Sequence, residues 1–196
     1  MTDIYLCRHG RTQLNVAGRL RGRLDPDLDI VGFAEARDLA EELSRVEPTR
    51  VISSPLHRAL DTAKPIAEAA ELTVETDDRL LDRDYGQFDG TLAADVLDTY
   101  GSFDAAPGVE PAAAVATRGV ELLTELIDGE EGPIVVVSHD AVIRLVLDAL
   151  VPSPKAEFHH IQPRTGCWTL LRHGAEGWRL IKANSKDDPI ETALAR

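Results

Sequence analysis

The stretch Ile4-Tyr5-Leu6-Cys7-Arg8-His9-Gly10-Arg11-Thr12 joins a short apolar run to a polar turn. Consecutive apolar residues without polar alternation are typical of a strand that is buried on both faces. The turn places a guanidinium and an imidazole, from Arg8 and His9, just past the strand's carboxyl end. Ligands of open parallel sheets bind at that end of the strands. The stretch therefore predicts a buried strand that leads into a functional turn.

Two further strand ends carry the same residue types. Residues 50–53 form a short strand candidate that precedes Arg58, and the apolar residues 134–137 precede Ser138-His139. If these strands are parallel neighbours of the first, two imidazoles and two guanidiniums meet at one crevice. Helix N-termini at the same edge would add N–H donors and positive dipole ends.

Strand and helix patterns alternate along the chain. We expect Asp29 to cap a helix over residues 30–44, and Ser54-Pro55 to be the N-cap and first residue of a helix that ends near residue 70. The remaining elements that the patterns predict are a strand at 72–76, helices near 91–100, 111–128 and 141–150, and a hairpin of 167–172 with 178–183. This order predicts an α/β fold, a three-layer α/β/α sandwich with a mostly parallel central sheet.

The length of 196 residues predicts a single domain over residues 1–196. Residues 77–110, rich in glycine, are expected to form a lid or insertion, residues 152–166 a further part of the rim, and residues 185–196 a polar tail. No apolar run approaches the roughly 18 residues that cross a bilayer, and the N-terminus lacks a signal-peptide pattern. Cys7 and Cys167 lie in apolar runs without a CxxC motif, so we expect a reducing, cytoplasmic location.

The net charge of −13 is unevenly distributed. Five arginines and one acid in residues 1–23 give that segment a balance of 5 − 1 = +4. An acidic protein repels nucleic acid and anionic membranes, so neither is an expected partner. A local arginine cluster instead indicates a site for a small anion.

A phosphate monoester fits such a site best. Arginine presents a planar fork to phosphate oxygens, and a neutral imidazole can attack phosphorus and hold the phosphoryl group covalently. Because enzymes accelerate this hydrolysis up to ~10²¹-fold, a nucleophile, a charge clamp and a leaving-group acid are all required. This chemistry needs no metal, and we expect no metal or cofactor.

Several motifs resemble those of one known family. Arg8-His9-Gly10-x-Thr12-x-x-Asn15 resembles the RHG signature of the histidine phosphatase (phosphoglycerate-mutase-like) superfamily. Later segments that are similar to further family blocks, in order and spacing, are Arg21-Gly22-x-x-Asp25, Ser53-Ser54-Pro55-Leu56-x-Arg58, Pro107-Gly108-x-Glu110 and Val137-Ser138-His139 followed by Val142-Ile143-Arg144. The resemblance covers about residues 3–150.

The resemblance implies a metal-free, two-step phosphoryl transfer. His9 would be the nucleophile that becomes phosphohistidine. The residues that would bind the phosphoryl group or line its pocket are Arg8, Thr12, Asn15, Arg21, Gly22, Arg58 and His139.

The sequence departs from the family at the proton donor. The family's acid block usually reads Leu-x-Glu-x-x-x-Gly, whereas residues 80–86 place Asp82 at the glutamate position, one methylene shorter. Asp84 is the alternative acid, and we favour Asp82. Either carboxyl needs a raised pKa to hold a proton near neutral pH. A second departure is Asp140, where many members have glycine; it could orient His139, but we favour a role as cap of the following helix.

These features favour a phosphatase that acts on a small phosphorylated metabolite, whose identity the sequence leaves open. A mutase-type phosphoryl transferase is the alternative, since Arg83 and Tyr85 are similar to the mutase form of the acid block. Residues 100–115, however, contain no arginine or lysine, whereas mutases carry paired arginines in the matching insertion. A non-catalytic phospho-ligand binder is the second alternative. Oligomeric state cannot be read from the sequence, and a homodimer stays open.

Overall fold

Strand β4 (Ile134–Ser138) lies within a six-stranded sheet and is buried along its whole length. The computed structural model describes residues 1–128, 132–151 and 162–185. The sheet order is β3 (Val74–Thr76), β2 (Arg50–Ser53), β4, β1 (Thr2–Arg8), β5 (Trp168–Gly174) and β6 (Gly177–Lys182). The pairs among β3, β2, β4 and β1 are parallel, and the hairpin of β5 and β6 is antiparallel.

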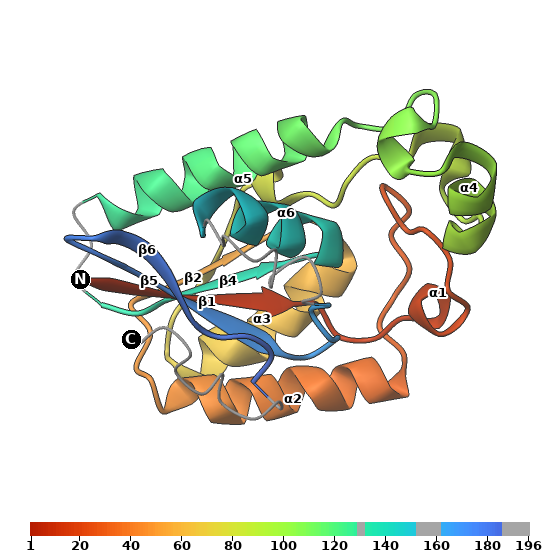
Figure 1. Cartoon of the computed structure of the whole chain (residues 1–196). Helices are drawn as coiled ribbons and strands as arrows, with labels where there is room; N and C mark the ends of the chain where they lie inside the picture. The colour runs from red at the N-terminus through yellow and green to blue at the C-terminus, as the bar shows by residue number, and fades with distance from the viewer. Residues whose placement is uncertain (129–131, 152–161, 186–196) are drawn as a thin grey trace.

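The side chains of β4 alternate between two apolar cores. Ile134 and Val136 pack with helices α5 (Ala112–Ile127) and α6 (Asp140–Leu150), and Val135 and Val137 pack with α2 (Ile30–Ser44) and α3 (His57–Ala69). Figure 1 shows α5 and α6 on one side of the sheet and α2 on the other. The predicted three-layer α/β/α sandwich with a mostly parallel sheet is therefore confirmed.

The register of the parallel strands brings their ends to one level. Arg8 pairs with Ser138 across β1 and β4, and Ser53 pairs with Val137 across β2 and β4. Two main-chain hydrogen bonds continue this alignment past the strands: His9 N–H donates to the Ser138 carbonyl (3.0 Å), and Ser54 N–H donates to the Val137 carbonyl (2.9 Å). The three strand ends therefore lie side by side at one edge of the sheet, as expected.

The helix starts were predicted with mixed success. Asp29 caps α2 as expected, since its Oδ1 accepts hydrogen bonds from the Val31 and Gly32 N–H groups (both 2.9 Å). The predicted cap Ser54-Pro55 is wrong, because α3 begins at His57 after Leu56. The reason is that Ser54 is still hydrogen-bonded to β4 and extends the sheet edge instead of starting a helix.

Shorter elements lie beyond the strand ends. They are α1 (Gln13–Val16), α4 (Ala93–Tyr100) and the 3-10 turns η1 (Asp78–Leu80), η2 (Gly86–Phe88) and η3 (Phe103–Ala105). Leu20, Tyr85, Val96 and Ala106 form a small third core there, and Figure 1 shows α1 and α4 at the end toward which β1 points. The lid at 77–110 and the single-domain organisation stay predictions. Residues 152–161 of the predicted rim and 186–196 of the predicted tail lie outside the described residues.

Within the described ranges, none of the helices combines the length and apolar character needed to span a membrane.

One close backbone contact fixes the turn after β1 against α2. A Cβ atom on Gly32 would collide with the Arg11 backbone, and one on Gly10 would collide with the Gly32 carbonyl. We expect Gly32→Ala to lower the free energy of unfolding by about 1–3 kcal/mol, because backbone on both sides leaves no room to relax. Urea denaturation measures this. The exposed Arg37→Ala on the same helix is the control and should change little; an equally stable Gly32→Ala would contradict the contact.

Candidate active site

His9 lies directly after β1 and is completely buried. Its Nδ1 lies 2.6 Å from the Gly10 carbonyl oxygen. A carbonyl oxygen only accepts hydrogen bonds, so Nδ1 donates and carries the ring proton. Burial lowers the pKa of His9 well below its ordinary value of 6.5, and the charges of Arg58, Arg8 and Arg21 lower it further. The imidazole is therefore neutral, and Nε2 keeps its lone pair.

His139 lies at the end of β4 as the N-cap residue of α6. Its ring centroid is 5.2 Å from that of His9. Nε2 of His139 forms a 2.8 Å hydrogen bond with the Ser54 hydroxyl. Burial, followed by the charge of Arg58, lowers the pKa of His139 well below 6.5. Sequence reasoning missed Ser54 as the partner of His139; its place at the end of β2 was the available signal.

Two arginines approach the imidazoles with their guanidinium groups held by the protein. Arg58 is fully buried, and its terminal nitrogens donate to the Leu24 carbonyl (2.6 Å) and the Gly22 carbonyl (3.1 Å). Arg8 donates from Nη1 to the Pro163 carbonyl (2.6 Å). Gly22, predicted to line the pocket, thus positions Arg58 through its carbonyl group.

Six buried side-chain nitrogens have no hydrogen-bond partner in the part of the chain that the structure describes. They are Nε of Arg8, Arg21 and Arg58, Nδ2 of Asn15, Nε2 of His9 and Nδ1 of His139. All six belong to residues that the sequence predicted for the phosphate site. Nε2 of His9 keeps its lone pair, whereas the arginine and asparagine nitrogens are donors. A buried donor without an acceptor costs about 1–3 kcal/mol, so these donors are suited to a ligand with several acceptor oxygens. A phosphoryl group supplies such oxygens.

Thr12 supports this cluster indirectly. It is fully buried, and its hydroxyl donates to Oδ1 of Asn15 (2.8 Å). The Thr12 N–H donates to the same oxygen (2.9 Å). These bonds leave the Asn15 Nδ2 group as the donor available to a ligand.

Asp82 and Asp84 lie in different surroundings. Asp82 is 1% exposed, its Oδ2 accepts from Arg58 (3.1 Å), and the same oxygen lies 3.9 Å from Nδ1 of His139. The Asp84 side chain is 46% exposed and accepts from the Gly86 N–H (2.8 Å). Only Asp82 of these two acids therefore belongs to the cluster.

Burial raises the pKa of the Asp82 carboxyl, although the nearby Arg58 charge acts in the opposite direction. Arg58 also interacts with Asp25, whose Oδ1 lies 3.5 Å from Nη1, and with two carbonyl groups, so its effect on the Asp82 pKa is limited. The direction of this shift favours the protonated form of Asp82, as a proton donor requires.

Glu110 and Arg118 brace the loop that carries Asp82. Arg118 donates to the carbonyl oxygens of Arg79 (2.6 Å) and Asp82 (3.3 Å), and Glu110 accepts from Arg118 (3.0 Å) and from the Asp84 N–H (3.0 Å). Glu110, part of a family block, therefore acts on the acid loop and not on the phosphate cluster.

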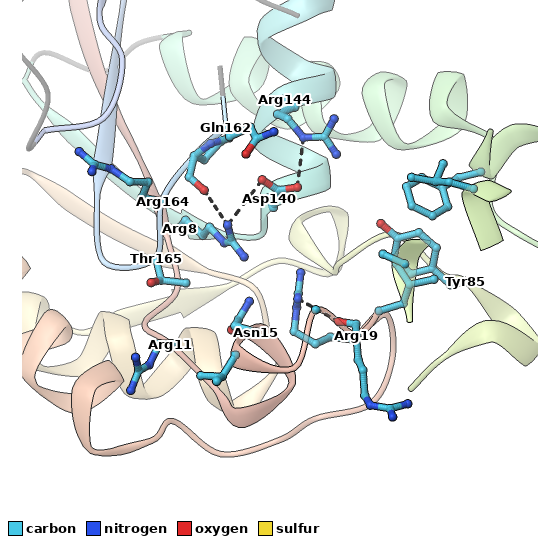
Figure 2. Close-up of a pocket in the computed structure, with 18 residues that line it drawn as sticks. Arg8, Arg11, Asn15, Arg19, Tyr85, Asp140, Arg144, Gln162, Arg164 and Thr165 are labelled. Atoms are coloured by element: carbon cyan, nitrogen blue, oxygen red, sulfur yellow. Dashed lines mark hydrogen bonds and ion pairs between the residues drawn. The ribbon is translucent and has the colours of Figure 1, made fainter. Parts of the chain in front are cut away.

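A cavity of about 830 Å³ opens beside the cluster, and Figure 2 shows the residues that line it. Arg8, Asn15 and Arg21 of the cluster reach its surface, together with Tyr85 and Asp140. His9 and His139 are fully buried below it.

Asp140 does not cap α6, and that prediction is wrong. The extended backbone of His139 makes His139 the N-cap, so Asp140 is the first residue of the helix. Its carboxylate lies 3.6 Å from Arg8 Nη1 and 3.1 Å from Arg144 Nε.

The sequence matches the family model of the histidine phosphatase superfamily (branch 1) over residues 4–186. The chain belongs to the histidine phosphatase superfamily. It is 35% identical to phosphoserine phosphatase 1 of Hydrogenobacter thermophilus over 170 residues, which cover 81% of this chain and 80% of that protein. It is 32% identical to glucosyl-3-phosphoglycerate phosphatase of Mycobacterium tuberculosis over 204 residues, which cover 90% of this chain and 92% of that protein.

Solved structures agree with this assignment. The mycobacterial glucosyl-3-phosphoglycerate phosphatase in complex with VO3 superposes with a TM-score of 0.81 at 30% identity, covering 91% of this chain and 96% of that chain. This histidine phosphatase is a phosphoric monoester hydrolase. Among the described residues, no group of three histidine, cysteine or acidic side chains could hold a metal ion.

The two buried imidazoles should make this phosphatase sensitive to acid. Their folded pKa values lie below 6.5, so below that pH the unfolded chain binds more protons and the free energy of unfolding falls. Each imidazole should therefore contribute to a loss of stability between pH 6.5 and 5. Urea denaturation at the two pH values measures the loss.

His139→Gln should remove about half of this acid-dependent loss. Asp82 acts in the opposite sense, because a raised folded pKa adds stability at low pH that is lost as pH rises through it. Asp82→Asn is therefore the control and should keep the histidine-dependent loss. An acid response that is identical in wild type and His139→Gln would contradict the neutral state of His139.

Proposed function

We propose that this phosphatase hydrolyses a small phosphorylated metabolite through a phosphohistidine on Nε2 of His9. The observation that carries the proposal is the neutral His9 imidazole, with Nδ1–H bound to Gly10 and Nε2 bare, among buried nitrogens that have no protein partner. A nucleophile and a set of oxyanion donors thus lie in one place, as phosphoryl transfer requires.

The reaction takes two steps. Nε2 of His9 attacks phosphorus, the N–P bond forms, and the P–O bond to the leaving group breaks as Asp82 gives its proton to the leaving oxygen. Water then attacks the phosphohistidine, Asp82 takes a proton from that water, and inorganic phosphate leaves. Arg8, Arg58 and His139 stabilise the phosphoryl oxygens, with Asn15 and Arg21 as further donors.

The substrate class follows from the relatives and from the cavity. Phosphoserine and glucosyl-3-phosphoglycerate are the small phosphorylated compounds in the names of two relatives, and a cavity of about 830 Å³ is large enough for molecules of this kind. Both cysteines are buried and free, which supports a reducing compartment such as the cytoplasm.

The mutase alternative has less support. Arg83 is nearly buried and donates to the Glu110 carbonyl (2.7 Å) and to Asp104 (2.9 Å), so its charge is used outside the cavity. Residues 100–115 supply Phe103 to the cavity and have no basic residue. This segment therefore supplies no cation to a bisphosphate, which the mutase reaction must hold; the arginines that line the cavity come from other segments.

Asp82→Asn should separate good from poor leaving groups. An alkyl phosphate needs protonation of its leaving oxygen, so kcat should fall about 10²–10⁴-fold, whereas turnover of an aryl phosphate should fall far less. Phosphate release measures both. The matched control is Asp84→Asn, which should change neither by more than a few-fold; the reverse pattern would make Asp84 the acid.

Asp82→Asn should also remove the fall in activity at high pH that the wild-type protein shows. With the alkyl ester, wild-type activity should fall as pH rises through the raised pKa of Asp82, because the proton donor is then lost.

His9→Ala should abolish turnover of both esters. Wild-type protein without any turnover of an aryl phosphate would support the non-catalytic binder instead.

Incubation with 3-phosphoglycerate and 2,3-bisphosphoglycerate should release inorganic phosphate faster than it forms 2-phosphoglycerate. Hydrolysis should prevail because residues 100–115 supply no arginine pair that would retain the bisphosphate. Phosphorus NMR follows all the products at once. Faster formation of 2-phosphoglycerate would overturn the phosphatase assignment in favour of a mutase.

A further inference from the structure

The cavity beside the phosphate cluster has two unlike walls. One wall is polar and contains Asp140, Arg144, Gln162, Arg164 and Thr165. The other side contains the apolar residues Val16, Leu20, Ala93, Leu97 and Phe103 together with Tyr85, and Arg11, Arg19 and Arg21 also line the cavity. Figure 2 shows Asp140 between Arg8 and Arg144, and Tyr85 across the cavity from them.

Asp140 and Arg144 form an ion pair on one face of α6. Arg144 Nε lies 3.1 Å from Asp140 Oδ2, and Arg8 lies 3.6 Å from Oδ1. The Asp140 side chain is 23% exposed and the Arg144 side chain 35% exposed, and both line the cavity. Both charges are therefore available to a molecule that occupies it.

Helix stabilisation alone does not account for this arrangement. A pair four residues apart, with the acid in the first helical turn, stabilises a helix by about 0.2–0.5 kcal/mol. The carboxylate, however, lies beside Arg8, whose positive charge the phosphoryl group needs. A negative charge at that position weakens the attraction for any dianion. This weaker attraction for phosphate is offset if the carboxylate contacts another part of the substrate.

The leaving group is the part of the substrate that meets this wall. The phosphate of the substrate lies among the buried nitrogens. The cavity that opens from Arg8 and Arg21 has to hold the remainder of the ester. Charged or hydrogen-bonding substituents are poorly solvated against Tyr85 and Leu97, so they turn to the polar wall.

We propose that Asp140 and Arg144 select substrates by the charge of the leaving group, an inference that rests on the proposed phosphatase function. Asp140 favours an ammonium or hydroxyl donor, and Arg144 favours a carboxylate or another anionic oxygen. A leaving group that carries a donor and an anionic oxygen close together satisfies both residues. The pair is thus specificity-determining, whereas the phosphate cluster handles the group common to all substrates.

Three two-carbon esters test the pair: ethyl phosphate (neutral), phosphoethanolamine (cationic) and phosphoglycolate (anionic). For each variant, kcat/KM on the charged esters is divided by its own value on ethyl phosphate. The ratio cancels any change in phosphate binding, including a change at Arg8, because all three esters share the phosphate. Comparing variants on one ester cancels the intrinsic reactivity of its leaving group. Where turnover is slow, each ester's Ki against hydrolysis of p-nitrophenyl phosphate replaces kcat/KM.

Asp140→Asn should lower the ratio for phosphoethanolamine and raise the ratio for phosphoglycolate, each by about tenfold for a charge a few ångströms away. Arg144→Gln should move both ratios in the opposite direction. Asp140→Glu, which keeps the charge, should preserve the wild-type order. The exposed Arg179→Gln on β6 removes a positive charge away from the cavity lining and should leave both ratios unchanged.

Variants that change all three esters by the same factor would overturn the proposal, since the pair would then act only on phosphate binding or on the fold. Asp140→Asn and Arg144→Gln should shift the kcat/KM ratios in opposite directions, so either variant tests the proposal if the other fails to fold. Failure of the phosphatase function is a separate result: wild-type protein would not hydrolyse p-nitrophenyl phosphate. In that case isothermal titration with the three esters tests the charge preference directly.

Discussion

The alignment of β1, β4 and β2 is the constraint on which the site depends. Two main-chain hydrogen bonds, from His9 to Ser138 and from Ser54 to Val137, hold three strand ends in register. Because side chains alternate between faces along a strand, a slip of one residue would turn each strand's core side chains to the opposite face and displace the junctions with it. The two imidazoles are 5.2 Å apart for this reason, although 130 positions separate them in the chain.

Burial then determines the protonation states of the site. Charged forms are disfavoured away from water, so both imidazoles are neutral and the pKa of Asp82 is raised. The guanidinium groups of Arg8 and Arg58 stay near them because carbonyl and carboxylate groups bind their terminal nitrogens. A phosphoryl dianion compensates these positive charges, and the same negative charge beside Asp82 favours its protonated form. In the proposed mechanism, the nucleophile, the arginines and the acid therefore stabilise one another only when the phosphoryl group is bound.

Local patterns predicted the parts that local physics controls. The apolar residues 4–7 identified β1 and thereby Arg8 and His9, and Asp29 capped α2 as expected. Ser54 and Asp140 were misassigned because their surroundings come from other segments: a sheet hydrogen bond extends past β2, and Arg8 lies beside α6. Asp82 and Asp84 have the same chemistry and differ in burial, which depends on how Arg118 and Glu110 hold their loop.

The two ends of the site consequently differ in how they are built. The phosphate end rests on the parallel strands and two apolar cores, where shifts of backbone position are costly. The leaving-group end is lined by segments outside the sheet: α1, α4, η3 and residues 162–165. Such segments tolerate substitution without loss of the sheet. Asp140 and Arg144 lie between these two ends, on a helix that the sheet positions and with side chains that line the cavity, which suits the specificity role proposed for them.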